Sequence, residues 1–162
     1  MDIFAGFGGL SSGLGEAGVA RLRWAIDFWK HAANAYQKNN PSAKVYNQEC
    51  NSFLKKAMDG LKGIPKKGEV DLLVGGPPCQ GFSMLNKFKD RENSKFKNSL
   101  IATSLSYCDF FRPKFFILEN VRNLVECERG MVLKLIMASL VKMGYSVGTF
   151  CLSWIILVFG GF

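Results

Sequence analysis

The chain has 162 residues, 48% of them hydrophobic, and carries a formal net charge of +8 at pH 7. This length and apolar content suit one domain with a packed core, and they exclude a disordered chain. The positive charge indicates a polyanionic partner, although charge alone does not define a fold.

Short apolar runs and helix-like segments alternate along the chain. Strands are predicted at residues 2–4, 23–28, 44–47, 69–74, 114–118 and 145–152. Helices are predicted at 11–17, 30–38, 51–58, 98–111 and 130–143, with Asn51 capping the third. This alternation predicts an α/β fold, a doubly wound and mostly parallel sheet with helices on both faces.

Unusual residues follow the predicted strands at the edge where a parallel sheet forms its binding crevice. They are a glycine loop at 5–9, Asp27, Glu49, Cys79 and Glu119, one after each of five successive strands. Acids with only structural roles would not be confined to strand ends. The pattern therefore predicts one site at the carboxyl edge of the sheet.

The glycine loop lets the backbone approach a ligand closely. It is neither a dinucleotide fingerprint nor a P-loop, because no glycine lies three positions after Gly8 and no Gly-Lys-Ser/Thr follows. Asp27 could accept hydrogen bonds from a ribose diol, and Glu49 from the amine of adenine. Together these residues predict an adenosine pocket without phosphates, for which S-adenosylmethionine is the candidate. The alternatives are a tight strand-to-helix turn and, for Asp27, a solvated surface acid.

Cys79 follows a turn made of two glycines and two prolines, residues 75–78. A stiff turn of this kind can mount a nucleophile, and a buried structural thiol is the alternative. Glu119 would end the neighbouring strand if the sheet winds outward in sequence. A thiolate and a protonated acid in one crevice suit addition to an electron-poor ring. The alternative for Glu119 is a buried glutamate bonded to backbone amides, and His31 is predicted to be a helix-face residue.

A basic segment at 86–97 interleaves Phe88 and Phe96 with cations. Its cationic residues are Lys87, Lys89, Arg91, Lys95 and Lys97. Basic groups beside aromatic rings suit phosphate neutralisation and contact with an opened base stack, so we predict a DNA-binding loop. A merely solvated loop is the alternative.

Two further classes of site are not expected. The five cysteines are widely spaced with no C-x-x-C pair, and only one histidine is available, so no metal site is predicted and the thiols should be reduced. No amino-terminal signal segment is predicted. The apolar run near the end is about half as long as a membrane-spanning helix, so no membrane partner is expected.

Three motifs make the chain resemble the DNA cytosine-5 methyltransferases, and most closely their animal maintenance-type branch. Residues 4–9 match F-x-G-x-G-G, residues 75–83 match the proline-proline-cysteine motif, and Glu119-Asn120-Val121 matches E-N-V. Residues 94–100 and 131–135 resemble the maintenance-type branch specifically. The resemblance covers residue 2 to about residue 145 and implies the Rossmann-like fold of S-adenosylmethionine-dependent methyltransferases.

The resemblance implies a role for each matching residue. Cys79 would attack carbon 6 of a cytosine flipped out of DNA, and Glu119 would contact ring nitrogen 3. Pro78, which would position the base, and Asn120 complete the implied catalytic set. Cofactor contacts would come from Phe4, Ala5, Gly6, Gly8, Gly9, Leu10, Asp27, Phe28, Trp29, Glu49, Cys50 and Gly75. The implied partner is DNA, with the target cytosine in a CpG context, and the implied location is the nucleus.

Two acids and the carboxyl-terminal residues depart from the family pattern. Asp27 stands where Glu is usual and Glu49 where Asp is usual, and both exchanges keep the carboxylate. Residues 1–150 are expected to form a partial catalytic domain and 151–162 a divergent apolar tail. The Q-x-R-x-R motif and the target recognition domain are not found in the sequence. The alternatives to an active enzyme are a truncated product that binds cofactor or DNA without turnover, and an unstable product with an exposed sheet edge.

Overall fold

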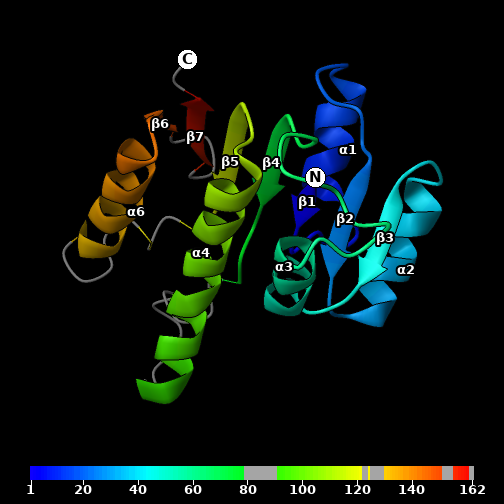
Figure 1. Ribbon diagram of the computed structural model, residues 1–162, viewed down its shortest axis with the longest axis horizontal. Coiled ribbons are helices and arrows are strands. Elements are labelled where there is room, and N and C mark those ends of the chain that lie inside the picture. Colours follow the sequence, from blue (N-terminus) through cyan, green and yellow to red (C-terminus); the bar gives the residue numbers. More distant parts are fainter. Residues whose placement is uncertain (79–90, 122–123, 125–129, 151–154, 161–162) are drawn as a thin grey trace.

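A computed structural model describes residues 1–78, 91–121, 124, 130–150 and 155–160, with side chains described for all of these except 91–99, 150 and 155–160. One seven-stranded sheet has the order β3-β2-β1-β4-β5-β7-β6 (Figure 1). Its strands are β1 Asp2–Ile3, β2 Trp24–Asp27, β3 Lys44–Asn47, β4 Leu72–Gly75, β5 Phe115–Glu119, β6 Tyr145–Phe150 and β7 Ile155–Gly160. Its helices are α1 Gly9–Glu16, α2 Lys30–Asn39, α3 Cys50–Met58, α4 Arg91–Phe111 and α6 Met131–Lys142.

The first five strands are parallel to one another. β1 pairs with both β2 and β4, and β5 pairs with β4, so the strand order reverses between β1 and β4. In open α/β sheets a ligand crevice forms at such a reversal, beyond the carboxyl ends of the strands. The predicted α/β fold is confirmed, and its topology marks the loops after β1 and β4 as neighbours.

Helices cover both faces of the sheet, and alternate strand residues serve the two layers. Ile26 of β2 packs with Phe53 of α3 in a large core that also holds residues of α4 and α6, which lie side by side (Figure 1). Ala25, next to it in sequence, packs with Tyr36 of α2 in a second, smaller cluster. Period-two alternation of buried residues is what a strand covered on both faces requires.

The second layer contains a buried acid. Asp2 of β1 is 3% exposed and accepts a hydrogen bond of 2.5 Å from the Ser11 hydroxyl of α1. Burial is the main cause that raises the pKa of Asp2 to about 6. The carboxyl therefore bonds α1 to the central strand from inside the protein.

The structure differs from the sequence predictions in three places. α4 begins at Arg91, so residues 91–97, predicted as part of a loop, are helical. Helix-compatible residues without Gly or Pro fill this stretch, and the apolar pattern used for the prediction begins only after it. The cap of α3 is Glu49 rather than Asn51, because the Glu49 carboxylate accepts the backbone N–H of Asn51 and Ser52.

The third difference lies in the carboxyl-terminal residues, where no strand was predicted. Residues 155–160 form β7, which pairs antiparallel with β5 on one side and β6 on the other. A run of Ile, Leu, Val and Phe suits a strand with neighbours on both sides. β7 therefore contributes to the sheet although its sequence departs from the motifs. None of the helices in the described ranges has the length and hydropathy to span a bilayer.

Candidate active site at the carboxyl edge of the sheet

The loop after β1 takes backbone conformations that favour glycine. Gly6 has φ +55° and Gly8 has φ +96°, and Phe4 also has a positive φ of 57°. A Cβ atom on Gly8 would lie 2.9 Å from the ring of Tyr36, so this glycine lets the start of α1 approach α2. The Gly8 amide donates to the Ala5 carbonyl at 2.9 Å, which closes the turn. The loop thereby keeps its backbone close to the sheet edge.

Asp27 fixes this loop from the end of β2. One carboxylate oxygen accepts the Gly6 N–H at 2.9 Å, and the other accepts the Trp29 N–H at 2.8 Å. The residue is 9% exposed, so the interpretation of Asp27 as a solvated surface acid is wrong. Each carboxylate oxygen has a second lone pair, which leaves Asp27 able to accept further hydrogen bonds.

Large aromatic side chains are exposed around the same loop. Phe28 is 72% exposed, Trp29 is 59% exposed, and Phe7 is 69% exposed. Phe28 and Trp29 were predicted as ligand contacts, and Phe7 was not. The signal for Phe7 was present in the sequence as a large apolar residue between glycines, where no core position is available to it. These rings provide exposed apolar surface beside the loop after β1.

Glu49 and Cys50 lie where β3 leads into α3, and their protonation states differ. Partial burial acts to raise the pKa of Glu49, but hydrogen bonds from the Asn51 and Ser52 amides outweigh it and lower that pKa. The Glu49 carboxylate is therefore ionised at neutral pH. Burial raises the pKa of the Cys50 thiol to about 12, and the backbone of Phe4 hydrogen-bonds that thiol. Cys50 is thus a neutral packing group that ties α3 to the end of β1.

The turn after β4 is held from two neighbouring strands. A Cβ atom on Gly75 would lie 2.6 Å from Cγ1 of Ile3, so only glycine lets β4 approach β1 at this point. Two residues further on, Pro77 is buried, and its carbonyl accepts a 3.1 Å hydrogen bond from Nδ2 of the buried Asn120. The same Asn120 uses Oδ1 to accept the N–H of Val121 at 3.0 Å. One asparagine therefore locks the Gly-Gly-Pro-Pro turn to the end of β5.

Glu119 lies directly beside this turn. Its Oε2 is 3.0 Å from the position that a Cβ atom would take on Gly76. Burial raises the pKa of the Glu119 carboxyl, which is half-buried. Within the part of the chain that the structure describes, no hydrogen bond or ion pair holds this carboxyl, so the interpretation of Glu119 as bonded to backbone amides finds no support there. Its proton is therefore held more tightly than that of a fully exposed glutamate.

The predicted site residues differ in where they lie: at the carboxyl edge of the sheet, in α4, or outside the described residues. The loop after β1, Asp27 and Cys50 are joined by hydrogen bonds, and β1–β4 pairing brings them to the edge that carries Gly75, Pro78, Glu119 and Asn120. Arg91, Lys95 and Lys97 belong to the first turns of α4, although their side chains are not described. Cys79, Lys87 and Lys89 lie outside the described residues.

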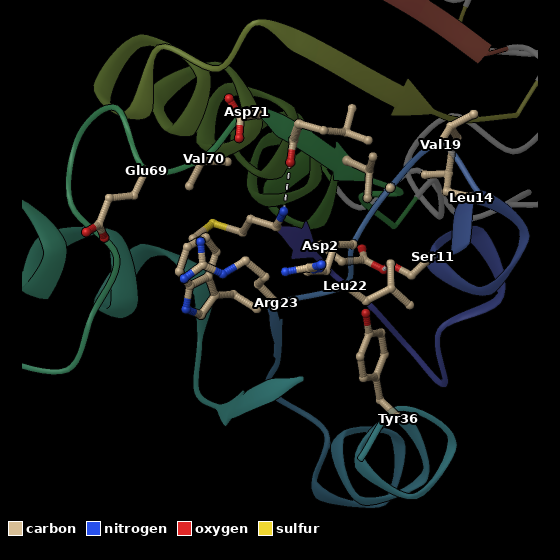
Figure 2. Close-up of a pocket in the computed structure, with 16 residues that line it drawn as sticks. Asp2, Ser11, Leu14, Val19, Leu22, Arg23, Tyr36, Glu69, Val70 and Asp71 are labelled. Carbon is tan, nitrogen blue, oxygen red and sulfur yellow. Dashed lines mark hydrogen bonds between the residues drawn. The ribbon is translucent and has the colours of Figure 1, made fainter. Parts of the chain in front are cut away.

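A cavity of about 320 Å³ lies at the other edge of the sheet, near the amino ends of β2 and β4. Figure 2 shows Tyr36 pointing from α2 toward Asp2 and Ser11 at one side of it, and Arg23, Glu69 and Asp71 lie around the rest. The sequence patterns did not predict this cavity. It contains none of the residues predicted for the site, so it is separate from the candidate active site.

Comparison with known proteins identifies the kind of chain that carries this site. Residues 1–157 match the model of the family described as C-5 cytosine-specific DNA methylase. DNA (cytosine-5)-methyltransferase 1 of Gallus gallus is 53% identical over 151 residues, which are 90% of this chain and 10% of that protein. The protein of the same name from Mus musculus is 52% identical, again over 90% of this chain and 9% of that protein. The chain spans about a tenth of the length of these curated relatives.

Solved structures agree on the fold. A putative DNA modification methyltransferase encoded within an E. coli prophage superimposes with a TM-score of 0.71 at 23% identity, over 98% of this chain and 45% of that chain. The Dnmt2 methyltransferase of S. pombe gives a TM-score of 0.67 at 18% identity, over 99% of this chain and 49% of that one. The chain thus has the Rossmann-like α/β fold of these two methyltransferases. With the family match over residues 1–157 and these identities, the chain belongs to the C-5 cytosine-specific DNA methylases, an enzyme family.

Proposed function

We propose that the chain carries catalytic and cofactor-binding residues of a DNA cytosine-5 methyltransferase. Such an enzyme transfers a methyl group from S-adenosylmethionine to carbon 5 of cytosine in DNA. The contact of Glu119 with Gly76 carries the proposal, at a turn whose Pro77 carbonyl accepts a hydrogen bond from Asn120. An acid whose pKa is raised by burial thus lies beside the turn that leads directly to Cys79. The names of the relatives support the reaction class.

The residues around the loop after β1 fit an adenosyl group. Asp27 has free lone pairs for a ribose diol, since its two hydrogen bonds leave one on each oxygen. The exposed rings of Phe28 and Trp29 offer a stacking surface for adenine, and the ionised Glu49 can accept from its amine. The loop holds no P-loop lysine, in keeping with a ligand that lacks phosphates. S-adenosylmethionine supplies, when bound, an electrophilic methyl group.

The chain's own residues would handle the cytosine ring. The Cys79 thiolate forms a bond to carbon 6 while the Glu119 carboxyl gives its proton to ring nitrogen 3, so that carbon 5 becomes nucleophilic. After carbon 5 has gained the methyl group, it loses its proton to a base. The carbon–sulfur bond then breaks, nitrogen 3 returns its proton to Glu119, and Cys79 leaves as the thiolate. A raised pKa suits Glu119 to this role, because the acid must be protonated when the ring arrives.

DNA is the proposed partner, with a flipped cytosine in a CpG context and binding support from the basic segment at 86–97. An extruded base is required because carbon 6 is not accessible to a thiolate inside a stacked duplex. The cations Lys87, Lys89, Arg91, Lys95 and Lys97 would neutralise phosphates on either side of that base. A nuclear location follows from this partner and is part of the same proposal.

A methyl-transfer assay tests the proposal. Purified chain, labelled S-adenosylmethionine and a duplex with CpG sites should give label in DNA, and Glu119→Gln should lower the rate by about a hundredfold, in the range typical of a lost general acid. Equal rates for the wild type and Glu119→Gln would overturn the assigned role of Glu119.

A second candidate function is binding of cofactor or DNA without turnover. It is favoured by the residues around the loop after β1, since Asp27 and the exposed rings could hold a ligand without any part played by Cys79 or Glu119. Calorimetry with S-adenosylmethionine distinguishes the two candidates. Heat of binding without any label in DNA would favour this second function, whereas label in DNA excludes it.

A further inference from the structure

Lysines gather at the edge of the sheet opposite the candidate active site. We define the α3–β4 basic surface as Lys44, Lys55, Lys62, Lys66 and Lys67, all of which are exposed. Lys44 begins β3, Lys55 lies in the last turn of α3, and the others lie in the connection from α3 to β4. β4 has four residues and is about 13 Å long at about 3.3 Å per residue. It separates the end of this connection from the turn that precedes Cys79.

Hydrogen bonds anchor the connection to the body of the domain. The Gly63 carbonyl accepts from Lys44 Nζ at 2.7 Å and from the Tyr46 hydroxyl at 2.6 Å. Further along, the Gly68 N–H donates to the Phe111 carbonyl at the end of α4, at 3.3 Å. The lysines of the connection are therefore presented by a segment tied down on two sides.

The charge of this surface is not balanced by neighbouring acids. Residues 55–69 contain five lysines against two acids, Asp59 and Glu69. The Glu69 carboxylate already accepts the backbone N–H of Lys66 at 2.8 Å. In the described ranges the ion pairs are Arg112–Asp109 and Lys114–Asp71, neither of which involves a lysine of the α3–β4 basic surface.

The helix dipole does not account for the cations of the connection from α3 to β4. A cation in the last turn of α3 stabilises the helix end, and Lys55 and Lys56 serve that purpose. The dipole effect falls off within the last turn, whereas Lys62, Lys66 and Lys67 lie beyond the helix. These three lysines are exposed, and none of them forms an ion pair among the described residues. Their charge is therefore available for a partner.

We propose that the α3–β4 basic surface binds the sugar-phosphate backbone of duplex DNA, separately from the DNA engaged at the carboxyl edge. Lysine ammonium groups neutralise phosphates without reading bases, so this contact is independent of sequence. A single strand would need aromatic rings on which to stack its bases. Between residues 44 and 71, all of which are described, the exposed large apolar side chains are the aliphatic Met58 and Leu61. The surface thus fits a duplex, and it requires neither catalysis nor a flipped base.

Fluorescence anisotropy with a labelled poly(dA)·poly(dT) duplex tests the proposal, because this duplex contains no cytosine. The comparison is between the wild type and the triple variant Lys62→Gln/Lys66→Gln/Lys67→Gln, titrated at several salt concentrations. Each phosphate contact contributes about 0.9 to the slope of log K against log salt concentration. The triple variant should therefore flatten the slope by about 2 to 3 and weaken binding at least tenfold at low salt.

A matched triple variant controls for net charge. Lys38→Gln/Lys134→Gln/Lys142→Gln removes the same charge from exposed positions on α2 and α6. Its slope should change by less than about 1. Equal effects of the two triple variants would overturn the proposal, as would a wild type that does not bind the duplex. Binding to phosphatidylserine vesicles that is lost in the first triple variant, with duplex binding kept, would assign the surface to a membrane instead. Because the duplex cannot be methylated, these results stand apart from the success or failure of the methyl-transfer assay.

Discussion

Nδ2 of Asn120 donates a 3.1 Å hydrogen bond to the carbonyl of Pro77, and both residues are buried. This contact joins the ends of β4 and β5, the two adjacent parallel strands that carry the Gly-Gly-Pro-Pro turn and Glu119. Proline has no amide donor and fixes its own φ, so the turn cannot hold itself by ladder hydrogen bonds. Asn120 supplies the bond that the turn lacks.

Asn120→Ala should destabilise the protein by about 1–3 kcal/mol, because it leaves the buried Pro77 carbonyl without a donor. Urea denaturation followed by circular dichroism measures the change in unfolding free energy. Asn39→Ala is the control, since Asn39 is exposed and donates only a 3.3 Å bond to the Phe7 carbonyl. A loss for Asn120→Ala no larger than for Asn39→Ala would contradict the assigned role.

Gly76→Ala should impair catalysis more than folding. Its Cβ atom would lie 3.0 Å from Oε2 of Glu119, so the carboxylate has to move by a few tenths of an ångström. Small misplacements of catalytic groups cost large factors in rate, and we expect methyl transfer to fall by about tenfold or more.

The control for this variant is Gly13→Ala. Gly13 lies in α1, and no atom lies within 4 Å of the position that its Cβ atom would take, so alanine should slightly stabilise the helix there. Rates that respond equally to both alanine variants would show that the contact between Gly76 and Glu119 has no catalytic importance.

Deprotonation of the buried Asp2 carboxyl should lower the free energy of unfolding as the pH rises from about 4 to 6. Burial, which outweighs the bond from Ser11, raises its folded pKa to about 6 from 3.8. The folded state then holds a proton that the unfolded state has already lost, so its stabilising contribution is present below pH 4 and is lost as the pH rises through 6. A shift of about two pKa units corresponds to roughly 3 kcal/mol.

Asp2→Asn tests this assignment, because the amide oxygen can still accept from Ser11 and does not titrate. Unfolding free energies at pH 4 and pH 6.5 should differ by less in the variant than in the wild type. An unchanged pH dependence in Asp2→Asn would show that another group titrates in this range.

Asp27→Asn should weaken binding of S-adenosylmethionine by about tenfold to a hundredfold, in line with the loss of a charge-assisted hydrogen bond. The variant keeps one acceptor oxygen but places an amide NH₂ opposite either the Gly6 or the Trp29 N–H. Calorimetry gives the dissociation constant, and Asp59→Asn serves as a control at an exposed acid in the α3–β4 connection. Unchanged affinity in Asp27→Asn would remove this residue from the proposed cofactor pocket.

The sequence was sufficient to predict the architecture because two kinds of evidence agree. The alternation of strands and helices and the unusual residues at the strand ends both indicate a parallel sheet. Each of β1 to β5 was predicted within three residues of its observed bounds, since each is a short apolar run bounded by polar or glycine residues. Placing the acids and the glycine loop on one edge required only that the strands be parallel.

Other features depend on contacts between distant residues and had no local signal. Asp27 is buried where it accepts the Gly6 N–H, a contact between residues 21 positions apart, so no local signal excluded the alternative of a solvated acid. The pairing of β7 with β5 joins segments that are far apart in the sequence, and the apolar run alone did not indicate it. Glu49 was predicted as a ligand group, and its capping of α3 depends on the helix beginning one residue earlier than expected.

Covalent trapping tests most directly whether Cys79 is the nucleophile that attacks cytosine. The chain is incubated with S-adenosylmethionine and a CpG duplex that carries 5-fluorocytosine, whose fluorine replaces the proton that must leave carbon 5 and so prevents release of the adduct. We expect a denaturation-stable complex in which mass spectrometry assigns the modified peptide to Cys79, with the complex absent in Cys79→Ser and present in Cys127→Ser. A stable complex that persists in Cys79→Ser, or no complex with chain that binds both S-adenosylmethionine and the duplex, would contradict this expectation.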